Sequence, residues 1–241
     1  MNATLTLTKL DVLRVVRNGR YLIFAIAMPA ALYLIIGKQT TQADGVDFKA
    51  YYMLAMATYG AFAGALMNNS IRIATERKSG WTRQLRLTSL PGWGYVFAKV
   101  VTSLVTTIPS VLVVFAIGAF LNDVQMPAWK WVANALILWV VSMTFVSLAV
   151  AIGYRFDPET AQPAVMLVFF PMALLGGLWF PLGTGVLEKI GKWFPTYQAH
   201  KLGTDILATG TVSATSIAVV AGWGLLFALL AVFSYRSAKE Q

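Results

Sequence analysis

The sequence has no cysteine, a single histidine and few charged residues, and each shortage removes a class of function. Without cysteine there is no disulfide framework and no thiolate metal site. One histidine, His200, leaves little material for metal binding or acid–base catalysis. Charged residues make up 12% of the chain and hydrophobic residues 58%, whereas a soluble domain carries about 25% charged residues. This composition indicates an integral membrane protein.

Motifs for nucleotide binding and catalysis are also missing. The chain has no G-x-x-x-x-G-K-[ST] sequence, so it cannot cradle the phosphates of ATP itself. No H-E-x-x-H motif, G-x-S-x-G motif or acidic pair lies in a hydrophobic run, which leaves an intramembrane protease without catalytic groups. His200 is interpreted as a structural hydrogen-bonding residue. An enzyme is therefore the least favoured class. The net charge of +9 does not indicate nucleic-acid binding, because the basic residues lie between hydrophobic runs.

The hydrophobic runs predict an all-α membrane domain that occupies residues 1–241 and crosses the bilayer six times. A span needs about 20 apolar residues, and the predicted spans are residues 21–37, 51–71, 95–121, 131–152, 161–181 and 214–235. Residues 1–20 mix apolar and basic side chains at helical spacing, which predicts an interfacial helix; the n-region of a cleaved signal peptide is the alternative. Residues 182–212 predict one or two short helices, re-entrant or interfacial.

The predicted spans contain almost no ionisable side chains, although ion-coupled transporters usually bury some at functional positions. Lys99 is expected to reach toward water from the cytoplasmic end of the third span. Gly60 and Gly64 in the second span predict close packing, preferably against another helix of the same chain. The fifth span is expected to be broken by Pro171 and by the glycines at 176–177.

The basic residues predict the orientation of the chain. With six spans, 13 of the 19 lysines and arginines, including all the arginines, fall on the side that holds both termini. By the positive-inside rule this side is cytoplasmic. The short loops and the absence of cysteine fit a bacterial inner membrane.

Residues 76–91, ERKSGWTRQLRLTSLP, form the longest basic segment, and their interleaved apolar residues predict a short amphipathic helix on the cytoplasmic surface. A chain without coupling chemistry of its own is either passive or takes energy from a partner that docks on the cytoplasmic side. Residues 76–91 are the first candidate for this docking surface, and the loop at 153–160 is the second. The alternative is a loop that only binds anionic lipid, at about 1 kcal/mol per basic residue.

The same segment resembles a pattern, E-R-x-x-G-T-x-x-x-L-x-x-T-P, found between spans two and three in permease subunits of ABC-2 type exporters, including the daunorubicin-type drug-export permeases. Glu76, Arg77 and Gly80 match its first half and Leu85 its second, whereas Trp81 stands where threonine is common. After the fifth span, GLWFPL at 177–182 and FPTY at 194–197 resemble a second family pattern. The resemblance covers essentially the whole chain. Each pattern is loose alone, and its specificity comes from the order and spacing of the patterns between the predicted spans.

The resemblance implies the permease subunit of an ATP-driven exporter, with no ATPase site or cofactor of its own. ATP and Mg would bind to a separate ATP-binding subunit, and a second permease chain would complete a homodimer or heterodimer. The resemblance places the coupling contacts at Glu76, Arg77, Gly80, Trp81, Arg83 and Leu85. It suggests a translocation path lined by Phe169, Phe170, Met172, Leu175, Trp179 and Phe180.

An aromatic and methionine-containing lining favours a hydrophobic or amphipathic cargo such as a drug, an antibiotic or a lipid. Two alternatives stay open at this stage. The same fold can export a polysaccharide or a lipid-linked glycan, and a non-transporting scaffold or sensor could use the basic loop to bind membrane lipid.

Overall fold

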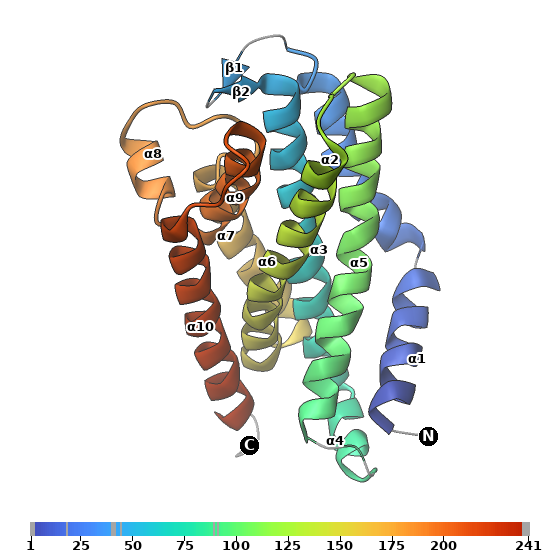
Figure 1. Ribbon diagram of the computed structural model, residues 1–241. Helices are drawn as coiled ribbons and strands as arrows, with labels where there is room; N and C mark the ends of the chain where they lie inside the picture. Colours follow the sequence, from blue (N-terminus) through green and yellow to red (C-terminus); the bar gives the residue numbers. More distant parts are fainter. Residues whose placement is uncertain are drawn as a thin grey trace.

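The computed structural model describes residues 3–17, 19–39, 42–43, 45–88, 90 and 92–237, which fold into a helical bundle (Figure 1). Six longer helices run along the bundle: α2 (Gly19–Ile36), α3 (Phe48–Lys78), α5 (Gly92–Leu121), α6 (Ala128–Arg155), α7 (Pro158–Leu175) and α10 (Ala214–Ser237). The remaining elements are α1 (Ala3–Arg17), α4 (Trp81–Arg86), α8 (Val186–Gly191), α9 (Pro195–Ala208) and a small antiparallel hairpin of β1 (Gln42–Ala43) and β2 (Val46–Asp47).

The central helix of the bundle is α3, which packs against α2, α5, α6 and α7. Its small residues allow this close packing. A side chain at Gly60 would collide with Ser110 of α5, which confirms for this glycine the predicted packing within the chain. Phe62 of α3 lies with its ring centroid 4.8 Å from Phe169 of α7 and 4.6 Å from Phe145 of α6. The aromatic core thus joins three helices.

Four helices in the described part of the chain are long and apolar enough to cross a membrane: α5 from Phe97, α6, α7 and α10. The protein is therefore a multi-pass membrane protein. In α2 the stretch Ile26–Ile36 is apolar but shorter. Helix α3 is long enough to cross a membrane but falls short of the hydropathy of these four helices. Its tyrosines, asparagines and small residues are largely buried among the other helices, and side chains that do not contact lipid need not be apolar. The six-span count stays a prediction.

The short elements lie at two opposite ends of the bundle (Figure 1). One end holds α4, the start of α1 and the end of α10, and we call it the α4 end. The other holds the hairpin, α8 and α9, and we call it the α8 end. The short helices expected after the fifth span are present as α8 and α9. Helix α1 lies alongside α5 near the α4 end (Figure 1).

Two predictions about helix ends are wrong. Residues 76–91 do not form one helix, because α3 continues to Lys78 and a turn at Gly80, where φ is +75°, separates it from α4. Helix α7 is not broken at Pro171, which lies on its exposed side. It ends only after Leu175, where Gly177 adopts a φ of +65° and the Leu178 amide donates to the Ala173 carbonyl oxygen over 3.1 Å.

Candidate docking site

The turn between α3 and α4 depends on the backbone of Gly80. Its φ of +75° lies in the left-handed region, which a residue with a Cβ atom adopts only at a cost. Apart from Gly80 and its chain neighbours, no atom of the described residues lies within 4 Å of the position that a Cβ atom would take. Backbone conformation, and not lack of space, therefore favours glycine here. The Gly80 carbonyl oxygen accepts the amide of Gln84 over 3.0 Å, which begins α4.

The apolar residues of α4 face in two directions. Trp81 and Leu85 pack inward, against a small core cluster at the α4 end made of Leu7, Ile73, Tyr95, Ala98, Val150 and Tyr154. The guanidinium of Arg14 on α1 lies 5.3 Å from the centroid of the Trp81 ring, a cation–π contact. Leu87, directly after α4, is 87% exposed. The side chain of Arg83, a predicted coupling residue, lies outside the described residues.

A buried cluster of two acids and two bases lies behind α4 and joins three helices. Lys99 of α5 places its Nζ 2.9 Å from Asp11 Oδ2 of α1 and 2.7 Å from Glu76 Oε1 of α3. Arg72 of α3 pairs with Asp11 over 2.5 Å and with Glu76 over 2.9 Å. The Tyr95 hydroxyl donates to Glu76 Oε2 over 2.7 Å. The charges of the cluster balance.

The cluster corrects the prediction for Lys99. This side chain does not reach toward water: it is 1% exposed, because two carboxylates accept its ammonium inside the protein. Glu76, a predicted coupling residue, is also largely buried, so its side chain joins helices at the back of the docking site. Burial raises the pKa of Glu76, but Lys99, Arg72 and the Tyr95 hydroxyl together outweigh it and hold the pKa below its usual value.

Sequence reasoning missed Asp11, although a signal was present. Leu7, Asp11 and Val15 are spaced four residues apart and are all buried, so they lie on one face of α1. An acid on the apolar face of an amphipathic helix requires a partner of opposite charge. The spacing could have identified Asp11 as buried, but it could not have identified Lys99 and Arg72 as its partners.

Arg77 connects the end of α3 to the loop between α6 and α7. Its guanidinium donates to the carbonyl oxygens of Tyr154 and Phe156, the latter over 3.0 Å. It also pairs with Asp157, just before α7, over 2.9 Å. Carbonyl oxygens at a helix end lack partners within the helix, and here an arginine from a neighbouring helix supplies donors.

The two segments that the sequence nominated for docking are therefore adjacent. Lys78 and Glu159 form a further pair over 2.5 Å, and both side chains are exposed. Residues 76–88 and 153–160 together form a surface at the α4 end, which we call the docking surface. Glu76, Trp81 and Leu85 face the bundle behind this surface, whereas Arg77 links its two halves.

The six predicted path residues do not share one environment. Phe169 and Met172 are buried, Leu175 and Trp179 are half-buried, and Phe170 and Phe180 are 51% and 61% exposed. The rings of Phe170 and Trp179 lie 5.6 Å apart. Only part of the predicted set thus reaches the outer surface of α7 and the turn that follows it.

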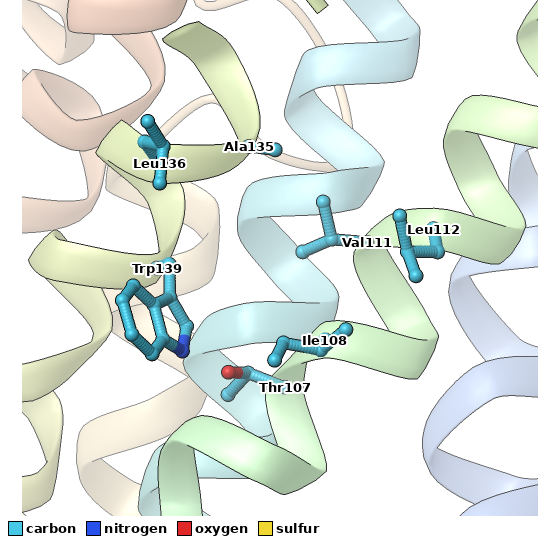
Figure 2. A pocket seen from close by; sticks show the side chains of 7 residues that line it. All are labelled: Thr107, Ile108, Val111, Leu112, Ala135, Leu136 and Trp139. Carbon is cyan, nitrogen blue, oxygen red and sulfur yellow. The ribbon is translucent and has the colours of Figure 1, made fainter. Parts of the chain in front are cut away.

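The surface on the side of α5 and α6 carries an apolar groove of about 240 Å³ (Figure 2). Figure 2 shows Thr107, Ile108, Val111 and Leu112 on one helix and Ala135, Leu136 and Trp139 on the other. The indole of Trp139 donates to the Leu104 carbonyl oxygen over 3.2 Å, five residues before Pro109. No ionisable side chain is among the residues that line this groove.

His200 has a structural role, as its sequence context suggested. Its Nε2 lies 3.2 Å from the Tyr51 carbonyl oxygen; because a carbonyl only accepts, this nitrogen carries the proton. The imidazole also contacts the Tyr51 ring edge-on, with centroids 4.5 Å apart. Burial lowers the pKa of His200 to about 4, so the ring is neutral and joins α9 to α3.

Comparison with known proteins gives two findings. The family model for the ABC-2 type transporter matches residues 2–199, a range that contains the ion cluster and both halves of the docking surface. A protein of Bacillus subtilis (strain 168) named "Putative transport permease YvfS" is 27% identical over 227 residues, which cover 92% of this chain and 93% of that protein.

Proposed function

Because the chain belongs to the ABC-2 type transporter family and is a membrane subunit of that kind, we propose that it exports a hydrophobic or amphipathic molecule with energy from a separate ATP-binding subunit. The α4 end, with both termini, faces the cytoplasm. Two permease chains pair in the membrane, and each contacts one ATP-binding subunit. ATP and Mg bind to that subunit and not to this chain.

The observation that carries this proposal is that α4 packs against the bundle on one side and presents an exposed leucine on the other. Leu87 projects from the docking surface with 87% of its area exposed, while Trp81 and Leu85 hold α4 against α1 and the bundle. An exposed leucine at the end of a short amphipathic helix suits insertion into an apolar groove of a partner, the way in which amphipathic helices bind such grooves. In this proposal Leu87 enters the ATP-binding subunit, and Trp81 and Leu85 transmit its movement.

The movement has two routes into the membrane part. Through Glu76 it reaches α1 and α5, since the ion cluster joins these helices to α3. Through Arg77 it reaches α6 and α7. A displacement of the α3–α4 turn would therefore act on most of the bundle and not on a single helix, as a switch between inward- and outward-facing states requires.

We propose that α2 and α3 also cross the bilayer, which makes six crossings. At 1.5 Å per residue the 31 residues of α3 extend over roughly 46 Å, more than the roughly 30 Å of a hydrocarbon core. The 18 residues of α2 extend over roughly 27 Å. Both helices run along the bundle beside α5 (Figure 1).

The cargo path in this proposal uses the outward-facing aromatic residues. Phe170, Trp179 and Phe180 form the lining, whereas Phe169, Met172 and Leu175 support them from the bundle side. Exposed aromatic rings suit a hydrophobic or amphipathic cargo. The second permease chain would close the path over α7.

The test is recovery of the ATP-binding subunit with the tagged permease from native membranes in mild detergent. Leu87→Asp is expected to lose the subunit, because a carboxylate would enter an apolar groove. Leu187→Asp, at a half-exposed leucine of α8, is the matched control and should retain it. Equal recovery with both variants would contradict docking through Leu87. If no ATPase comes down with the wild type, a non-transporting scaffold becomes the better interpretation.

A further inference from the structure

A second apolar groove lies toward the α4 end, between α5, α6 and α10. It has a volume of about 200 Å³, and its lining consists of Val100, Val146, Ser147, Val150, Ala228, Ala231, Val232 and Tyr235. The outward face of α10 beside it is apolar, with Leu229, Val232 and Phe233 exposed. In a multi-pass membrane protein such a face meets hydrocarbon, so an acyl chain can fill the groove.

Two arginines stand at the end of this groove. Helices α6 and α10 lie side by side and both end at the α4 end (Figure 1). The rings of Tyr154 and Tyr235, in their last turns, touch edge-on with centroids 5.2 Å apart. Each tyrosine is followed directly by an arginine, Arg155 and Arg236. Because Tyr235 lines the groove and touches Tyr154, each arginine lies one residue beyond this contact, at the α4 end of the groove.

These arginines differ from those of the docking site. Arg72 and Arg77 pair with acids, whereas neither Arg155 nor Arg236 forms an ion pair with an acid in the described ranges, and both side chains are exposed. The groove of Figure 2 does not reach these arginines, because none of its lining residues belongs to the last turn of α6. The two arginines thus lie at the end of the groove between α5, α6 and α10, whereas none of the residues that line the groove of Figure 2 is next to them in the sequence.

We propose that this groove and the two arginines bind one anionic phospholipid. The acyl chain lies in the groove between α5, α6 and α10, and the phosphate oxygens accept hydrogen bonds from both guanidinium groups. Basic sites between membrane helices at the cytoplasmic side bind anionic head groups, and the guanidinium fork matches phosphate geometry. The lipid would hold α10, which is the least buried of the four long apolar helices, against α6.

The proposal is tested by native mass spectrometry of the purified permease, without any ATP-binding subunit, in the presence of phosphatidylglycerol or of phosphatidylcholine with the same acyl chains. Wild type is expected to prefer phosphatidylglycerol by roughly 30-fold, since two basic side chains contribute. Arg155→Gln with Arg236→Gln is expected to abolish this preference. Lys9→Gln with Arg17→Gln removes the same charge from exposed positions of α1 and should leave it intact.

A third variant separates a lipid from a free phosphate. Ala228→Trp fills the groove and leaves both arginines in place, so it should lose bound phospholipid while its elution on size exclusion stays normal. Equal retention of the two lipids by wild type, or undiminished phosphatidylglycerol binding by the double glutamine variant, would overturn the proposal. If Ala228→Trp changed the oligomeric state and left the binding of phospholipid unchanged, that result would overturn the proposal too, because the groove would then be covered by a second copy of the chain. None of these results depends on ATPase docking.

Discussion

At the scale of single residues, Lys99 makes the strongest prediction, since it holds carboxylates from α1 and α3 in a place that water does not reach. Lys99→Met removes the ammonium and leaves Asp11 and Glu76 with only Arg72 to balance them. Breaking a buried ion pair by removing one partner costs about 3–5 kcal/mol. We expect a loss of that size in the free energy of unfolding, measured by equilibrium denaturation in mixed micelles.

The cluster also predicts a rescue. Adding Asp11→Asn to Lys99→Met restores charge balance and should recover a large part of the lost stability, because Arg72 and Glu76 then remain as a pair. The matched control is Lys78→Met, which removes an exposed lysine from its pair with Glu159 and should change stability little. A Lys99→Met protein as stable as wild type would show that the buried charges do not hold these helices together.

His200 makes a prediction about pH. Its pKa in the folded protein, about 4, is lower than the usual 6.5 because of burial, with Lys201 acting in the same direction. As pH falls below 6.5 the unfolded chain takes up a proton that the folded protein does not, so stability decreases. Between pH 7 and pH 5 the loss from this group is about 2 kcal/mol.

The measurement compares the pH dependence of unfolding for wild type and His200→Gln. The glutamine amide can still donate to the Tyr51 carbonyl oxygen but does not titrate, so its curve should be flatter over this range. The carboxyl of Glu76, whose pKa is lowered, affects both proteins alike and only at lower pH. Parallel curves for the two proteins would rule out a neutral, buried His200.

At the scale of elements, the turn between α3 and α4 can be tested through Gly80. Gly80→Ala adds a methyl group where there is space but in a left-handed conformation, which costs about 1–2 kcal/mol. We expect reduced recovery of the ATP-binding subunit, because α4 loses its fixed direction, and a small loss of stability. Gly185→Ala is the control, since that position also has open space but an extended backbone. Equal effects of both substitutions would contradict a conformational role for Gly80.

The elements also show how far the sequence could predict this structure. Each hydrophobic run became a long helix, because apolar runs of that length have few other stable forms in a membrane protein. The predicted ends agree with the helices within three residues, except that α3 continues seven residues past residue 71 and α7 ends six residues before residue 181. The break at Gly80 was missed since an amphipathic pattern continues on both sides of it. The hairpin was missed because β1 and β2 have two residues each, too few for a periodic signal.

The candidate site was predictable in part, because composition is a local property of the sequence whereas contacts between helices are not. The basic segment and the polar loop at 153–160 were both identified from composition, but their contact through Arg77 depends on α3 and α6 lying side by side. Lys99 was misplaced because its position near the end of a span suggested a route to water. No local sequence pattern indicates that Asp11, far earlier in the chain, pairs with Lys99 and keeps its ammonium inside the protein.

At the scale of the whole molecule, the arrangement of the ends predicts a topology. Leu87 and Arg236 lie toward the α4 end, whereas Lys38 and Val186 lie toward the α8 end, and all four side chains are exposed. If α2 and α3 cross the membrane as α5, α6, α7 and α10 do, the first pair faces the cytoplasm and the second pair faces outward. The natural chain has no cysteine, so single cysteines can be placed without background labelling.

The experiment labels Leu87→Cys, Arg236→Cys, Lys38→Cys and Val186→Cys separately, in intact spheroplasts, with a maleimide that cannot cross the membrane. Lys38→Cys and Val186→Cys should react at once, and the other two only after the membrane is opened. Lys38 decides the span count, because it lies between α2 and α3. If Lys38→Cys reacted only in opened membranes while Val186→Cys reacted in intact spheroplasts, α2 and α3 would not cross as a pair. Six crossings would then be wrong, although the four long apolar helices would still span.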